Sequence, residues 1–149
     1  MKSFITALVI FAITIALVIT NAVYVDNSAK VLTEAANAMP SLDQLREYGL
    51  ADAEKSNQND EFPEESREQM REYGINAIAH FEEIWNQRRN TLELFIVYDY
   101  IYNIQSTVDQ IKDFFDGEFY TDYATQRKML LSAIQRLGEV EELTWDSIF

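Results

Sequence analysis

The sequence predicts an all-α protein, in which an N-terminal transmembrane helix is followed by an extracytoplasmic bundle of four to five amphipathic helices. Three observations support this prediction. The segment 4–25 contains no charged residue, although charged residues make up 25% of the chain. The apolar residues that follow recur mainly at intervals of three and four, which is the helical period. The chain has only four glycines and two prolines, whereas turn-rich β domains use more of both.

Residues 1–25 are predicted to be the transmembrane anchor. A helix rises about 1.5 Å per residue, so the uncharged segment would span about 33 Å, and the hydrocarbon core of a bilayer is about 30 Å thick. Its threonine hydroxyls can bond to carbonyls of their own helix, which lowers their cost in lipid. The apolar side chains expected to anchor this helix are Phe4, Leu8, Phe11, Ile15, Leu17 and Ile19.

A secretory signal peptide is the alternative for the same segment. Lys2 would be its positive n-region and the apolar run its core. Cleavage after Ala22 would need small residues at both recognition positions, and Thr20 is a mediocre one. The apolar run is also longer than the usual signal core. The sequence therefore favours an uncleaved anchor over a signal peptide.

The flanking charges predict the orientation of this anchor. Lys2 is the only charged side chain before the span, and Asp26 is the first after it. The positive-inside rule then places the N-terminus in the cytoplasm and residues 26–149 outside a single-pass cell-membrane protein.

The overall charge limits the possible partners. The chain carries 25 acidic and 12 basic residues and a net charge of −13. Such a surface repels nucleic acid, because binding to phosphates needs Lys and Arg. We therefore expect no nucleic-acid partner, and expect the lipid bilayer and a membrane or extracytoplasmic protein instead. The absence of cysteine excludes disulfides and thiol catalysis.

Residues 26–55 are predicted to form juxtamembrane helices. Pro40 cannot donate a backbone hydrogen bond and interrupts a helix, so we expect one stalk from Phe4 to Met39 with the bundle beyond it. Ser41 and Gln44 have the spacing of a capping box that begins a new helix. A polar loop is predicted at 56–62.

Residues 63–149 are predicted to form the helical domain. Pro63 suits the first turn of its first helix. A second capping box at Asn90–Glu93 predicts that the next helix begins there, and Asp116-Gly117 that it ends. A last helix follows. The core residues expected from the helical spacing are Met70, Ile78, Phe81, Trp85, Tyr98, Ile101, Ile111, Leu130, Ile134 and Leu137.

The end of the chain is also apolar. Trp145, Ile148 and Phe149 would waste apolar surface in water, so we expect this tail to pack on the bundle.

Patterns that carry catalysis are missing from the sequence. His80 is the only histidine, whereas a di-iron bundle needs two Glu-x-x-His motifs and a catalytic zinc three protein ligands. The acidic segment 113–122 does not fit a calcium loop, because the ligand positions set by Gly117 would fall on Lys112, Phe114 and Tyr123. We predict no catalytic, cofactor-binding or metal-binding residue, no cofactor and no enzymatic activity.

The layout of the chain resembles that of the DUF4363 family of small bacterial membrane proteins. The resemblance rests on the Met1-Lys2 start, the N-terminal span, the central Trp85, the segment LELFIVYDYIYNI at 92–104 and the acidic-then-apolar tail 141–149. It implies a membrane location and a helical fold. The family has no established activity, so the resemblance implies no chemistry.

These observations leave two hypotheses of different classes. The first is a membrane-anchored helical domain for protein interaction or assembly at the outer face of the cell membrane. The alternative is an extracytoplasmic ligand-sensing domain that works through a partner.

Overall fold

The computed structural model describes residues 2–51 and 63–146, and all regular structure in these residues is helical. The helices are α1 (Lys2–Ala38), α2 (Leu42–Glu47), α3 (Glu64–Leu92), α4 (Tyr98–Asp116) and α5 (Tyr120–Asp146). The prediction of an all-α fold is confirmed. The predicted loop at 56–62 and the predicted packing of the tail at 145–149 lie outside what the structure describes.

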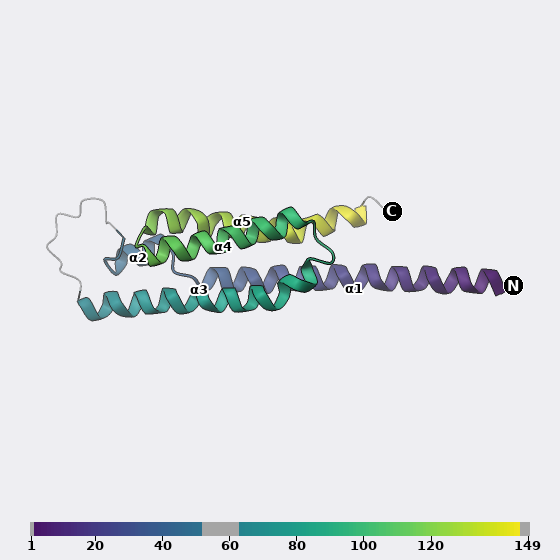
Figure 1. The fold of residues 1–149 in the computed structure, drawn as a ribbon, viewed down its shortest axis with the longest axis horizontal. Helices are drawn as coiled ribbons and strands as arrows, with labels where there is room; N and C mark the ends of the chain where they lie inside the picture. Colours follow the sequence, from purple (N-terminus) through teal and green to yellow (C-terminus); the bar gives the residue numbers. More distant parts are fainter. Residues whose placement is uncertain (1, 52–62, 147–149) are drawn as a thin grey trace.

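The four long helices form an up-and-down bundle in which neighbouring helices run antiparallel (Figure 1). α3 contacts α1 and α4, and α5 contacts α4 and α1, so the helices close a ring around a common core. α1 projects beyond the bundle at one end, which we call the proximal end (Figure 1). The short α2 packs against α5 at the other, distal end.

α1 belongs to the bundle only along its C-terminal half. Val25, Leu32 and Ala36 are fully buried in the core of the molecule, and Met39, directly after the helix, is almost fully buried there. The bundle thus packs alongside this half of α1, and the expected stalk with the bundle beyond it is wrong. The reason is physical: an amphipathic helix is stabilised by burying its apolar stripe, and here α3 and α5 cover that stripe.

The predicted core residues form the interior of the bundle with one exception. Tyr98 is 70% exposed, so the prediction that it belongs to the core is wrong. It lies in the first turn of α4, whereas α3 ends at Leu92, and the facing helix no longer covers that position. The buried members are Met70, Ile78, Phe81, Trp85, Ile101, Ile111, Leu130, Ile134 and Leu137.

The connection between α1 and α2 follows the sequence pattern. α1 ends just before Pro40, and α2 begins with the predicted capping box. The backbone N–H of Gln44 donates to Ser41 Oγ at 3.2 Å, and the N–H of Ser41 donates to Gln44 Oε1 at 2.8 Å. Both predictions are confirmed.

The connection between α3 and α4 differs from the prediction. α3 continues through Asn90 to Leu92, and α4 begins at Tyr98, so a turn occupies 93–97. Leu92 is fully buried, and its burial holds the last turn of α3 in the helix. Tertiary packing therefore overrides the local capping signal at Asn90–Glu93, and the prediction of a helix start there is wrong.

Candidate functional site

The acidic and histidine side chains that could support catalysis are dispersed. His80 is exposed on α3, and Glu118 forms an ion pair with Arg71 at 3.1 Å. Across residues 2–51 and 63–146, no group of three or more His, Cys, Asp or Glu side chains is placed to hold a metal ion. Lys112 forms an ion pair with Glu82 at 3.1 Å, and the hydrogen bond that it donates to this carboxylate raises the pKa of the lysine. The first ion pair links α3 to the turn between α4 and α5, and the second links α3 to α4.

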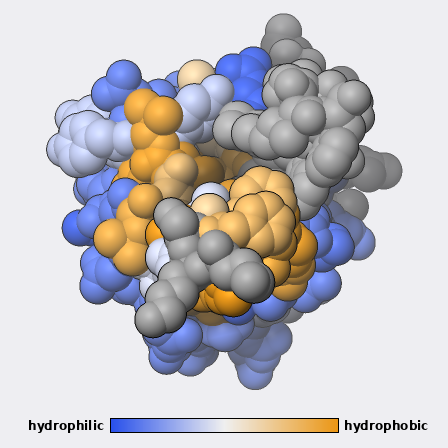
Figure 2. Space-filling model, turned by 90° about the vertical axis from the view of Figure 1, so that its right-hand side faces the viewer, coloured by the Kyte–Doolittle hydropathy of each residue, from blue (hydrophilic) through white to orange (hydrophobic). Residues whose placement is uncertain are grey.

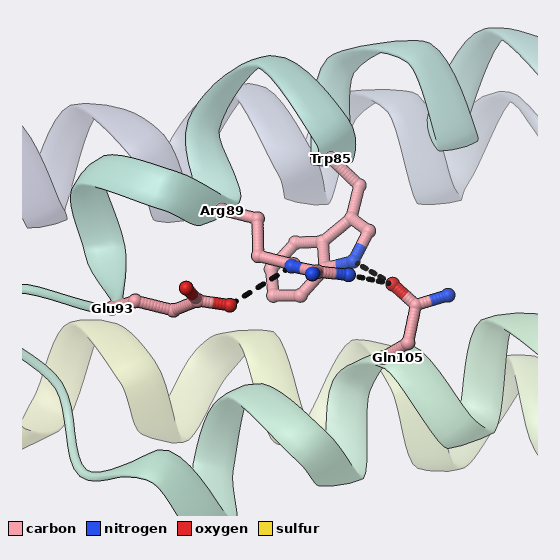
Figure 3. A network of polar contacts seen from close by, with 4 residues as sticks. All are labelled: Trp85, Arg89, Glu93 and Gln105. Carbon is pink, nitrogen blue, oxygen red and sulfur yellow. Dashed lines mark hydrogen bonds and ion pairs between the residues drawn. The ribbon is translucent and has the colours of Figure 1, made fainter.

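A polar network joins α3 to α4 in the proximal part of the bundle (Figure 3). The indole N–H of the buried Trp85 donates to Gln105 Oε1 at 2.7 Å, and Arg89 Nη1 donates to the same oxygen at 3.2 Å. Arg89 Nε also donates to Glu93 Oε1 at 2.9 Å. A buried indole N–H without a partner would cost about 1–3 kcal/mol. The network therefore stabilises the place where α3 ends.

Three side chains from other helices hold the C-terminal end of α1. The last carbonyls of any helix lack partners within that helix. Here Tyr73 of α3 and Tyr123 and Arg127 of α5 donate hydrogen bonds of 2.7–3.3 Å to them. We call this group the α1 clamp. The accepting carbonyls are those of Ala36, Asn37 and Ala38 at the end of α1, and that of Pro40 in the connection that follows.

The α1 clamp is partly buried and carries one positive charge. Burial raises the pKa of the Tyr123 hydroxyl well above its ordinary value, so it stays a hydrogen-bond donor. The guanidinium of Arg127 lies against the negative end of the α1 dipole, which is the favourable sign. The clamp therefore fixes α1 to α3 and α5 and makes it a rigid part of the bundle.

A groove of about 720 Å³ lies open between α1 and α5. Its floor is apolar, and Lys30, Glu34 and Lys128 stand along it. Lys30 is paired with Asp26 at 2.7 Å. Such an open groove between two helices suits a ligand or a short segment of another protein. The apolar residues of its lining are Ala29, Leu131 and Ile134.

The projecting half of α1 carries a long run of exposed apolar side chains. The predicted anchor residues Phe4, Leu8, Phe11, Ile15, Leu17 and Ile19 are 42–73% exposed. Apolar residues gather around this end of the molecule when it is viewed from the proximal side (Figure 2). Within the described part of the chain, α1 is the one helix long and apolar enough to cross a membrane by length and composition.

Sequence reasoning missed the α1 clamp and the exposed apolar turn at 93–97. Tyr73 and Tyr123 have the spacing of core residues, so nothing in the pattern distinguishes their hydroxyl role. Arg127 did carry a signal, because it is a charged residue on the apolar face of α5. The apolar segment 94–98 has a spacing that fits the buried stripe of a helix. Only the end of α3 at Leu92 shows that most of this segment is a turn.

Comparison of the chain with models of protein families, with curated proteins and with solved structures finds no match. The resemblance to the DUF4363 family therefore stays a prediction.

Proposed function

We propose that this chain is a single-pass membrane protein. In this proposal α1 crosses the cell membrane with its N-terminus in the cytoplasm, and residues 26–149 stand at the outer face. The helical domain acts there in protein interaction or assembly, with a membrane or extracytoplasmic protein as partner.

One observation carries the membrane part of this proposal: α1 is a single helix whose two halves meet different surroundings. Its C-terminal half is covered by α3 and α5, whereas the apolar side chains of Phe4–Ile19 are exposed to the outside. An apolar surface of this extent is unfavourable in water and favourable in the hydrocarbon of a bilayer. A helix that is apolar all round is typical of a membrane span.

The interaction role is supported by how the domain is built. Its core is filled with apolar side chains, and the buried or partly buried polar groups of the α1 clamp and the Trp85 network form contacts between helices. α1 is at once the proposed span and a wall of the bundle. A partner bound to the bundle would thus be held rigidly to the membrane helix.

Membrane fractionation of the full chain tests the anchor. We expect the protein to stay in the membrane pellet after extraction at alkaline pH, with the mass of the uncut chain. A mass that corresponds to cleavage after Ala22 would instead support the signal peptide. A reporter active only in the cytoplasm, fused after Phe149, should be inactive, and activity would overturn the orientation.

Cross-linking in native membranes tests the interaction role. A photoreactive residue in place of Ser132, which lines the α1–α5 groove, should yield one stoichiometric protein adduct. The matched control is a photoreactive residue in place of the exposed His80 on α3. The same adducts from both positions, or none from Ser132, would contradict binding in this groove.

Ligand sensing through a partner is the second candidate, and the α1–α5 groove favours it. A small solute bound between Lys30 and Lys128 would contact α1, the helix that is proposed to enter the membrane. A thermal-shift screen on the full chain in detergent tests it. A solute that raises the melting temperature of the natural protein and fails to do so for Lys128→Ala would support sensing at this groove.

A further inference from the structure

The turn between α3 and α4 displays large apolar side chains to the outside. Leu94 is 75% exposed and Val97 is 67% exposed, and Phe95 between them is also exposed. A cluster of this kind usually marks an interaction site. Because polar residues normally fill turns between helices, these residues need an explanation.

The turn is a fixed structure. The backbone N–H groups of Phe95 and Ile96 both donate to the carbonyl of Leu92, at 3.0 and 2.8 Å. Ile96 packs against the core, so it holds the turn down while its neighbours face outward. The apolar side chains are therefore presented in a defined direction.

The turn lies at the proximal end of the bundle, beside the place where α1 leaves it (Figure 1). Arg88 on α3 donates to Ser28 on α1 at 3.1 Å, so these residues are at the same level. The two helices run antiparallel and rise about 1.5 Å per residue. Leu92 is therefore level with about Tyr24, and the turn is level with the outer end of the predicted span Phe4–Val25.

Two tyrosines extend this apolar surface along α4. The rings of Tyr98 and Tyr102 stack with their centroids 6.1 Å apart, and both side chains are exposed. Tyrosine is enriched where a membrane meets water, because its ring is apolar and its hydroxyl is polar. Along α4, the tyrosine pair lies farther from the predicted span than the turn does. It is therefore on the side where a membrane interface gives way to water.

We propose that the α3–α4 turn is a second membrane contact of this protein. Leu94, Phe95 and Val97 enter the boundary between headgroups and acyl chains of the bilayer that α1 crosses, and the tyrosine pair lies at the headgroups. Burial of apolar side chains holds the turn at the membrane, and attraction to lipid charge does not contribute. Glu93 and Asp99 flank the turn, and their negative charges would be repelled by anionic headgroups. This inference rests on the proposed function and adds that the bundle stands on the membrane at a fixed tilt.

Fluorescence in vesicles tests this contact in the full chain. Because the chain has no cysteine, single labels with an environment-sensitive dye can be placed through Phe95→Cys or, as a second variant, Val97→Cys. The protein is inserted into zwitterionic phosphatidylcholine vesicles with or without a lipid that carries a shallow spin-label quencher. We expect blue-shifted emission from both labels and loss of most of it with the quencher.

Phe119→Cys provides a matched control. Phe119 is also an exposed phenylalanine in a turn between two helices, at 60% exposure, but its turn lies at the distal end (Figure 1). Its label should emit as in water and resist the quencher. Circular dichroism should be the same for all labelled variants.

A label at Phe11→Cys separates this inference from the proposed function. Phe11 lies near the centre of the proposed span, so this label is measured with a lipid whose spin label lies deep among the acyl chains. If that label is quenched by lipid while the turn labels behave like Phe119→Cys, the second contact is overturned and the span stands. If the Phe11→Cys label is not quenched, the membrane span itself is wrong. The turn labels could also be blue-shifted and yet resist the quencher. That result would mean that protein, such as a second copy of the chain, covers the turn, and it would also overturn the lipid contact.

Discussion

The two halves of α1 have the same backbone conformation and opposite surroundings. From Phe4 to Ile19 the helix is apolar on every side and exposed, whereas from Val25 to Ala36 it buries one apolar stripe against α3 and α5. The second half carries Asp26, Lys30 and Glu34 on its outer face. One helix can thus change from one kind of surrounding to another without a break, and the distribution of charge along it marks the change.

The strongest way to break this comparison is to put charges into the first half. The double variant Phe11→Arg/Ile15→Arg adds two guanidinium groups near the centre of the predicted span, at a cost of about 5–7 kcal/mol for the pair. We expect loss of membrane association in the alkaline extraction. The control Ile75→Arg/Met129→Arg changes two exposed apolar residues of the bundle and should stay in the membrane; equal release of both variants would contradict the proposal.

Truncating one leucine in each half gives the next largest effect. Leu32 is fully buried and Leu8 is exposed. Leu32→Ala should lower the free energy of unfolding by about 2–5 kcal/mol, because it leaves a cavity. Leu8→Ala should change it by less than about 0.5 kcal/mol. Denaturation in mild detergent, followed by the tryptophan fluorescence to which the buried Trp85 contributes, measures both variants. Similar losses would refute the difference in surroundings.

Alanine substitutions at two helical glycines should change the free energy of unfolding by smaller amounts and in opposite directions. A Cβ at Gly74 would overlap the ring of Phe115, which packs edge-on against Tyr120 and Tyr123 with centroids 5.5 and 5.0 Å apart. Gly74→Ala should therefore destabilise the bundle, because overpacking costs about 1–3 kcal/mol and exceeds the gain in helix propensity.

Gly138→Ala should act in the other direction. Its Cβ would lie 3.6 Å from Ala29 Cβ of α1, an ordinary contact, so only the helix-propensity gain of about 0.5–1 kcal/mol remains. The same denaturation experiment measures both glycine variants. Destabilisation by Gly138→Ala would show that α1 and α5 lie closer together here than described.

An effect of similar size to that of Gly138→Ala concerns the α1 clamp. Tyr123→Phe removes the hydrogen bond to the Pro40 carbonyl, which should lower the free energy of unfolding by about 0.5–1.5 kcal/mol near neutral pH.

The pH dependence of the same variant gives a second measurement. Burial raises the Tyr123 pKa in the folded state, so the unfolded chain releases this proton first. Stability is full below the ordinary tyrosine pKa of about 10 and falls as the pH rises above it. Tyr123→Phe should reduce this alkaline loss, and an unchanged pH profile of unfolding would contradict the assignment.

Much of the fold could be predicted because the signals are local. The helical period of apolar residues identifies the inner faces of α3, α4 and α5, and the cap at Ser41 depends on residues three apart. The end of α3 could not be predicted in this way. There the capping signal at Asn90–Glu93 competes with the burial of Leu92, and burial is known only when the neighbouring helices are in place.

The candidate site divides in the same manner. The exposed apolar half of α1 is visible in the sequence, since it needs only length and absence of charge. The α1 clamp joins residues up to 91 positions apart, and no local pattern pairs Arg127 with the end of α1. The turn at 93–97 is apolar in the sequence, but its exposure follows from where α3 stops.

The sequence alone determined that the chain is helical, where its apolar span lies and which faces point inward, because backbone propensity and periodicity are properties of neighbouring residues. The tertiary structure decided that α1 is a wall of the bundle, that Tyr98 lies outside the core and that an apolar turn stands beside the emerging α1. These three features depend on the lengths of helices that are distant in sequence and on their antiparallel register. Only the packing of the helices against one another fixes that register.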